Sequence, residues 1–128
     1  MSQDSATDLS DRHASLRAAS IVAAQHLMKN EAVLFRATRG DGAESLARHE
    51  LVYVLHVGAG LSLNRVAKAL KRDRSTISYA VRMVEESLDD AGRAVRMERL
   101  VTLAKEAIEL GAMHDRVLEE LIERERSR

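Results

Sequence analysis

The chain contains no cysteine, no proline, no tryptophan and only one phenylalanine. Without cysteine it can form neither a disulfide bond nor a thiolate metal site. With so few aromatic residues, its core must consist of Ala, Leu, Val, Ile and Met, a set that suits helices. No stretch shows the alternating β-branched or aromatic pattern of a strand. The sequence therefore predicts an all-α protein.

Long apolar runs are also missing. No run approaches the roughly 18 apolar residues of a membrane span, and the polar start MSQDSATDLSDR lacks the basic and apolar parts of a secretory signal. We therefore expect a cytoplasmic protein with no membrane partner. Its 128 residues suit one domain with an appendage, because single cores usually span about 100–150 residues.

The net charge gives no hint of a partner, because 20 Lys and Arg residues balance 20 Asp and Glu residues. The charges are nevertheless segregated along the chain. The segment from Ser62 to Arg82 holds six basic residues and one acidic residue, whereas residues 85–128 hold twelve acidic and eight basic residues. A basic segment of this kind is the expected footprint of a nucleic-acid partner.

Periodic apolar residues predict a bundle of about five helices with a C-terminal helical extension. Residues 1–10 are polar and are expected to form a disordered tail. Residues 11–110 are expected to form the domain, and residues 111–128 a C-terminal helix for oligomerisation or partner binding. Glycine and capping residues place the helices at about 11–28, 31–35, 46–57, 63–70, from 74 onward, 89–110 and 112–124, with a loop over 38–45.

The segment from Ser62 to Arg82 has the pattern of a helix-turn-helix. Ser62 can cap a short helix, and Asp73 can cap the helix that starts at Arg74 after the turn Lys71-Arg72-Asp73. In this motif the second helix enters the major groove of DNA with its first turns. A small crossing residue, Ala67, and an apolar clamp complete the pattern; the clamp consists of Val66, Leu70, Ile77, Ala80 and Val81.

The exposed start of the second helix carries side chains that suit DNA. Arginine donates two hydrogen bonds to guanine, and serine and threonine bond bases or phosphates. The alternative is a basic helical hairpin whose charges are merely solvated, because charged residues cover the outside of most helices. We predict base contacts from Arg74, Ser75, Thr76, Ser78 and Tyr79, and phosphate contacts from Lys68, Lys71, Arg72 and Arg82.

The order of elements around this motif resembles the C-terminal DNA-binding domain of the bacterial chromosomal replication initiator DnaA. The shared features are an alanine-rich first helix in IVAAQHLMKNEAVLF, a loop, Arg48 opening the next helix, the pair Ser62-Leu63, and the element RDRSTI at residues 72–77. The resemblance covers about Leu16 to Ile108, and RDRSTI is its most specific part. It implies a helix-turn-helix fold and a double-stranded DNA partner in a bacterial cell.

The resemblance also implies roles for single residues. Asp73 would cap the recognition helix and accept a hydrogen bond from a cytosine amine. Arg74 stands where the family has histidine, which should favour guanine at a position where the family recognises thymine. The other implied contacts are to bases from Arg74, Ser75 and Thr76, to phosphate from Arg48 and Leu63, and to the minor groove from Arg39.

The initiator's ATPase module has no counterpart in this chain. The sequence lacks a GxxxxGK[ST] motif and is too short to add a nucleotide-binding sheet. We therefore expect no nucleotide and no cofactor, and we favour a nucleoid-associated transcription regulator that binds specific DNA sequences. Two alternatives stay open: an accessory or competing factor at DnaA-type replication boxes, and a protein-interaction adaptor on a helix-turn-helix scaffold.

Neither a metal site nor an enzyme is expected. The histidines show no close spacing of metal ligands, and no strand-turn-helix context surrounds a serine nucleophile. The C-terminal apolar stripe has no obvious cover, which makes it a candidate for homodimerisation or partner binding. That stripe consists of Val117, Leu118, Leu121 and Ile122.

Overall fold

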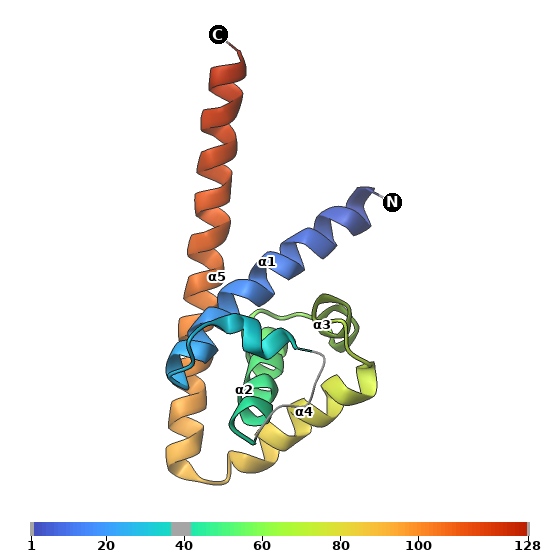
Figure 1. Cartoon of the computed structure of the whole chain (residues 1–128), viewed down its shortest axis with the longest axis vertical. Helices are drawn as coiled ribbons and strands as arrows, with labels where there is room; N and C mark the ends of the chain where they lie inside the picture. Colours follow the sequence, from blue (N-terminus) through green and yellow to red (C-terminus); the bar gives the residue numbers. More distant parts are fainter. Residues whose placement is uncertain (1, 37–41, 128) are drawn as a thin grey trace.

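A computed structural model describes residues 2–36 and 42–127, with side chains from residue 6 onward. This part of the chain is entirely helical and contains no strand, which confirms the all-α prediction (Figure 1). The elements in chain order are α1 (Ser2–Gln25), the 3-10 helix η1 (Glu31–Phe35), α2 (Gly42–Tyr53), the π-helical turn η2 (Val54–Gly58), α3 (Leu63–Leu70), α4 (Arg74–Ser87) and α5 (Ala91–Arg126).

The core is aliphatic, as the shortage of aromatic residues requires. Helix α2 packs against α4 and α1, while α5 packs against α1 and η2. Fully buried side chains come from each layer, including Leu51 of α2, Leu55 of η2, Ile77 of α4 and Leu100 of α5. Among the described elements, α4 packs mainly against α2 and the neighbouring α3. Only one face of α4 is therefore buried.

The C-terminal region is one helix rather than two, so the predicted break at Gly111 is wrong. Helix α5 runs without interruption from Ala91 to Arg126, and its C-terminal half extends beyond the other helices (Figure 1). A glycine inside a helix costs only about 1 kcal/mol relative to alanine, which is too little to end a helix of this length. A Cβ atom at Gly111 would lie 1.5 Å from Arg17 Nε, and the missing side chain lets Arg17 reach Asp115 at 3.3 Å.

Two further element boundaries differ from the sequence-based expectation. Helix α1 begins at Ser2, so residues 2–10 are helical where a disordered tail was predicted. Asp8 in this part of α1 pairs with Lys68 of α3, and the next acidic residue, Asp11, pairs with Arg65 of α3. Helix α2 begins at Gly42, inside the predicted loop over 38–45. Residues 38–41 of that predicted loop lie outside the described part.

No helix in the described ranges has the length and apolar character needed to cross a lipid bilayer.

Candidate DNA-binding surface

Helices α3 and α4, and the tight turn between them, lie where the helix-turn-helix was predicted. The Ser62 hydroxyl accepts a hydrogen bond from the Arg65 amide at 3.2 Å and so caps α3, as predicted. Lys71 ends α3 in the left-handed conformation at φ 55°, and the Arg72 amide donates to the Ala67 carbonyl at 2.9 Å. The chain is thereby turned tightly enough for α4 to begin at Arg74, the residue that the sequence indicated.

Asp73 occupies the cap position of α4, but its side chain makes no capping hydrogen bond. The predicted side-chain cap is therefore wrong, although the extended backbone of Asp73 is that of a cap residue. Its carbonyl oxygen instead accepts the first helical hydrogen bond, from the Ile77 amide at 3.1 Å. The Asp73 carboxylate is exposed next to the first turn of α4 and remains available to a ligand.

One face of α4 is buried and the opposite face is exposed. The buried face consists of Ile77, Ala80, Val81 and Val84. Because residues three, four and seven apart share a helix face, Ser75, Ser78, Tyr79 and Arg82 lie together on the opposite side. All six predicted base-contact residues are exposed: Asp73, Arg74, Ser75, Thr76, Ser78 and Tyr79.

Tyr79 is held in place by two neighbours. Its ring makes an edge-to-face contact with His49 of α2, with centroids 5.8 Å apart and an interplanar angle of 79°. The guanidinium carbon of Arg82 lies 5.7 Å from the centroid of the same ring, in cation–π range. Tyr79 and Arg82, which are both expected to face DNA, are therefore held in a fixed arrangement relative to each other. His49 of α2 supports the Tyr79 ring from the other helix.

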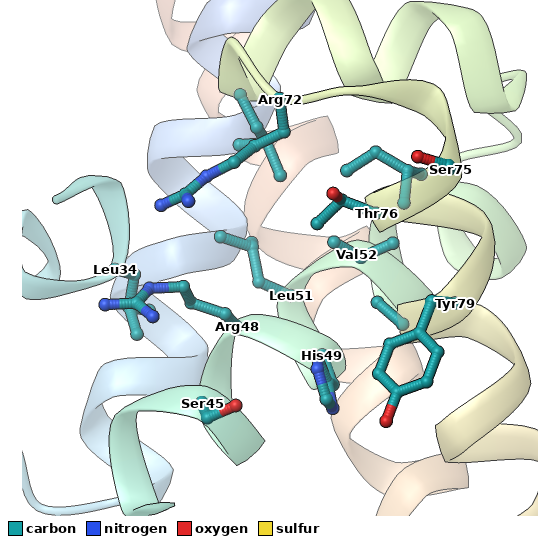
Figure 2. Close-up of a pocket in the computed structure, with 13 residues that line it drawn as sticks. Leu34, Ser45, Arg48, His49, Leu51, Val52, Arg72, Ser75, Thr76 and Tyr79 are labelled. Atoms are coloured by element: carbon teal, nitrogen blue, oxygen red, sulfur yellow. The ribbon is translucent and has the colours of Figure 1, made fainter. Parts of the chain in front are cut away.

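A cleft of about 700 Å³ lies beside this face, between α2 and α4. Figure 2 shows Ser75, Thr76 and Tyr79 on its α4 side and Ser45, Arg48 and His49 on its α2 side. The Arg48 and Arg72 side chains extend toward the part of the cleft where Leu34 lies (Figure 2). The first turns of α4 thus border a hollow with hydroxyl and cationic groups on its rim and apolar residues below.

His49, which lines the cleft, makes the stability of the fold depend on pH. Burial, and next the positive charge of Arg48, lower the pKa of His49 below 6.5. Because the unfolded chain then binds the proton more tightly than the folded chain, the stabilisation that His49 provides is present above pH 6.5 and is lost as the pH falls through the lowered value.

We expect the wild-type protein to lose free energy of unfolding more steeply between about pH 7 and pH 5 than a His49→Gln variant. Urea denaturation of both proteins at a series of pH values measures the difference. Parallel pH profiles would contradict the assignment. The other histidines are present in both proteins, so their contribution cancels in the comparison.

The predicted phosphate-contact residues lie in different environments. Lys68, Lys71 and Arg82 are exposed, and Arg72 donates a hydrogen bond to the Arg36 carbonyl while lining the cleft. Leu63 is half-buried as the first residue of α3. Arg48 lies in the second turn of α2 rather than opening it; its side chain is only 13% exposed and is 3.6 Å from Glu44. Arg39 lies outside the described residues.

A group of charged residues that the sequence did not predict lies where α1 packs against α3. Arg65 of α3 donates to the Asp11 carboxylate from Nε at 3.0 Å and from Nη2 at 2.7 Å. This hydrogen bonding raises the pKa of Arg65. Lys68 Nζ lies 3.1 Å from Asp8 Oδ2, and Arg12 lies in the same groove. These pairs join residues that are more than fifty positions apart, so local patterns did not identify them.

A second unpredicted group is the buried carboxylate of Glu50 on α2. His26 Nε2 lies 2.6 Å from Glu50 Oε1, and Arg93 Nη1 contacts Glu50 Oε2. The Arg93 Nε atom also donates to the Ser87 hydroxyl at 3.2 Å. These contacts join the segment just after α1 to α2, α4 and α5, which indicates a structural role. Among the residues that the structure describes, no cluster of His, Asp or Glu is arranged to hold a metal ion.

Comparison of the chain with protein families, with curated proteins and with solved structures gives no match.

Proposed function

We propose that the protein binds specific sequences of double-stranded DNA by inserting the start of α4 into the major groove. The observation that carries the proposal is the exposed face of α4, which presents small polar and cationic side chains over two turns directly after the helix-turn-helix corner. A major groove about 12 Å wide admits one helix, and the motif places its reading residues at the start of that helix.

The chemistry of this face matches base edges along a short stretch of helix. Arg74 can donate two hydrogen bonds to guanine, and the Thr76 methyl can pack on a thymine methyl. Ser75 and Ser78 are small, so the α4 backbone can approach the groove closely. The exposed Glu85 and Glu86 follow in the last turn of α4, where their negative charge disfavours phosphates. The DNA-facing part of α4 therefore extends from Arg74 to Arg82.

We infer that the biological role is transcription regulation in a bacterium. The resemblance to the DNA-binding domain of the initiator DnaA supports DNA binding, and the missing GxxxxGK[ST] motif separates this chain from the initiator's ATPase function. A competing or accessory factor at DnaA-type boxes would use the same surface. The two roles differ only in the sequence that is bound.

The direct experiment is selection of bound duplexes from a random-sequence library, followed by affinity measurement at several salt concentrations. We expect an enriched motif that contains guanine. We also expect the logarithm of the association constant to fall against the logarithm of salt concentration with a slope of about −3, because each neutralised phosphate contributes about −0.9. Failure to enrich any sequence, together with no binding to mixed duplexes at low salt, would contradict the proposal.

One observation favours the adaptor as a second candidate. The projecting half of α5 exposes six large apolar side chains: Leu110, Met113, Val117, Leu118, Leu121 and Ile122. Such a stripe is typical of helices that bind another helix, either in a second copy or in a partner protein. Binding through this stripe would respond little to salt, so the same titration distinguishes the adaptor from a DNA-binding protein.

A further inference from the structure

We propose that the DNA backbone continues from the start of α4 onto the junction of α1 and α3. There Arg12 contacts a phosphate from outside the helix-turn-helix, and Asp8 acts as an internal counter-ion that DNA must displace from Lys68. The inference rests on the proposed function and adds α1 to the binding surface. It assigns roles to two residues that the motif does not contain.

The surface is continuous from α4 to the junction of α1 and α3. Three grooves follow one another and share lining residues. The cleft beside α4 and a groove of about 490 Å³ at the α1–α3 junction share Leu70 and Arg72. That second groove and a third, of about 220 Å³, share Arg12 and Lys71. A path therefore leads from the exposed hydroxyls of α4 to α1 over one connected surface.

The charge along this path changes from basic to mixed. Three charged residues line the middle groove, and all three are basic: Arg12, Lys71 and Arg72. The acidic residues appear only at the far end, where Asp8 and Asp11 line the third groove beside Lys68. A polyanion that follows the path from α4 meets cations first and carboxylates last. Such an arrangement suits a phosphate backbone, whose contacts are mainly electrostatic and independent of sequence.

The two ion pairs at the far end of the path differ in burial and in the number of hydrogen bonds. Asp11 is only 6% exposed and receives two hydrogen bonds from Arg65, so this pair is part of the packing between α1 and α3. In contrast, Lys68 is 66% exposed and Asp8 is 45% exposed, and one contact of 3.1 Å joins them. Exposed pairs of this kind are weak and readily exchange partners. Lys68 can therefore leave Asp8 for a phosphate.

The exchange has a measurable consequence for salt dependence. When Lys68 moves to a phosphate, the condensed cation that it releases from DNA is offset by the cation that the freed Asp8 carboxylate attracts. The Lys68 contact then contributes little to the salt slope. Removing the Asp8 charge restores that contribution, so affinity rises and the slope steepens by up to about 0.9. Removing the Arg12 charge lowers the affinity and makes the salt slope shallower.

The test uses the full chain and a fluorescent duplex of about 30 base pairs of mixed sequence, because backbone contacts need no specific site. Binding is measured by anisotropy between about 0.05 and 0.2 M salt. For Arg12→Ala we expect several-fold weaker binding at low salt and a slope shallower by about 0.9. For Asp8→Asn we expect tighter binding and a steeper slope. Arg99→Ala and Glu119→Gln make the same charge changes on exposed positions of α5 and should leave the slope unchanged.

The measurements distinguish a DNA path over α1 from DNA binding by α4 alone. If Lys71→Ala weakens binding while Arg12→Ala and Asp8→Asn behave like their α5 controls, the path over α1 is overturned and DNA binding by α4 stands. If wild-type protein fails to bind the duplex at low salt, both proposals fail. If Asp8→Asn weakens binding, Asp8 is not a displaced counter-ion. Circular dichroism of each variant verifies that the helices are intact.

Discussion

Replacing Glu50 by alanine is expected to lower the free energy of unfolding by about 3–5 kcal/mol, because breaking a buried ion pair leaves its partner's charge without compensation. The Glu50 side chain is only 2% exposed, and both of its oxygens are used, by His26 and by Arg93. The guanidinium of Arg93 is itself largely buried. Truncation therefore removes the counter-ion of a charge that has little access to water.

The effect should extend beyond one contact, since the Glu50 carboxylate joins elements that are distant in the sequence. His26 lies just after α1, and Arg93 lies in the first turn of α5. Urea denaturation followed by circular dichroism measures the loss. Glu86→Ala serves as the matched control, because Glu86 is exposed and substitutions at such surface sites usually change stability by no more than about 0.5 kcal/mol.

A double variant distinguishes charge burial from loss of packing. Glu50→Leu combined with Arg93→Leu removes both charges, and apolar replacement of a buried pair is often neutral or stabilising. We therefore expect the double variant to be more stable than Glu50→Ala. A cost below about 1 kcal/mol for Glu50→Ala, or a double variant less stable than the single one, would contradict the assigned role of this carboxylate.

The local parts of the fold were predictable from the sequence because their signals are local. Capping residues and apolar periodicity correctly predicted three positions: the Ser62 cap, the turn at Lys71 and the start of α4 at Arg74. The apolar spacing also identified the buried face of α4, and thereby the exposed one. A short helix with a side-chain cap, such as α3, has little freedom in where it begins.

The remaining parts depend on contacts between distant segments, which local patterns do not reveal. A glycine at position 111 suggested a helix end, but the helix continues and the missing Cβ accommodates Arg17 of α1. Asp8 and Asp11 are one turn apart, as are Arg65 and Lys68, so the complementary spacing was present in the sequence. Only the structure brings the two helices together, and the polar start of the chain was therefore mistaken for a disordered tail.

Some features of the candidate site were likewise predictable from the sequence, and others depend on how the helices pack. Exposure of the residues at the start of α4 followed from helical periodicity, whereas the support of Tyr79 by His49 depends on how α2 packs against α4. Arg48, expected at phosphate through the resemblance to DnaA, is mostly covered and lies beside Glu44. Its expected contact therefore requires the side chain to leave Glu44, whereas Lys71 and Arg82 are already exposed.

Arg74→Ala is expected to weaken binding to the selected DNA site by about 1–3 kcal/mol, or roughly 5- to 150-fold, because a bidentate contact to guanine is lost. The same substitution should weaken binding to a mixed-sequence duplex much less, since only a general electrostatic contribution disappears there. Lys71→Ala is the matched control. It removes an equal charge from the turn just before α4, and its loss should be similar on both duplexes if Lys71 contacts phosphate.

A double-mutant cycle between protein and DNA identifies the base that Arg74 contacts. Each guanine in the selected motif is replaced in turn, and affinity is measured for the wild-type and Arg74→Ala proteins. At the contacted position the wild-type protein loses affinity while the variant loses little more, which gives a coupling free energy of about 1–3 kcal/mol. Equal losses for both proteins at every guanine would mean that Arg74 contacts only the backbone. Sequence preference would then have to come from the other exposed side chains of α4 or from the shape of the DNA.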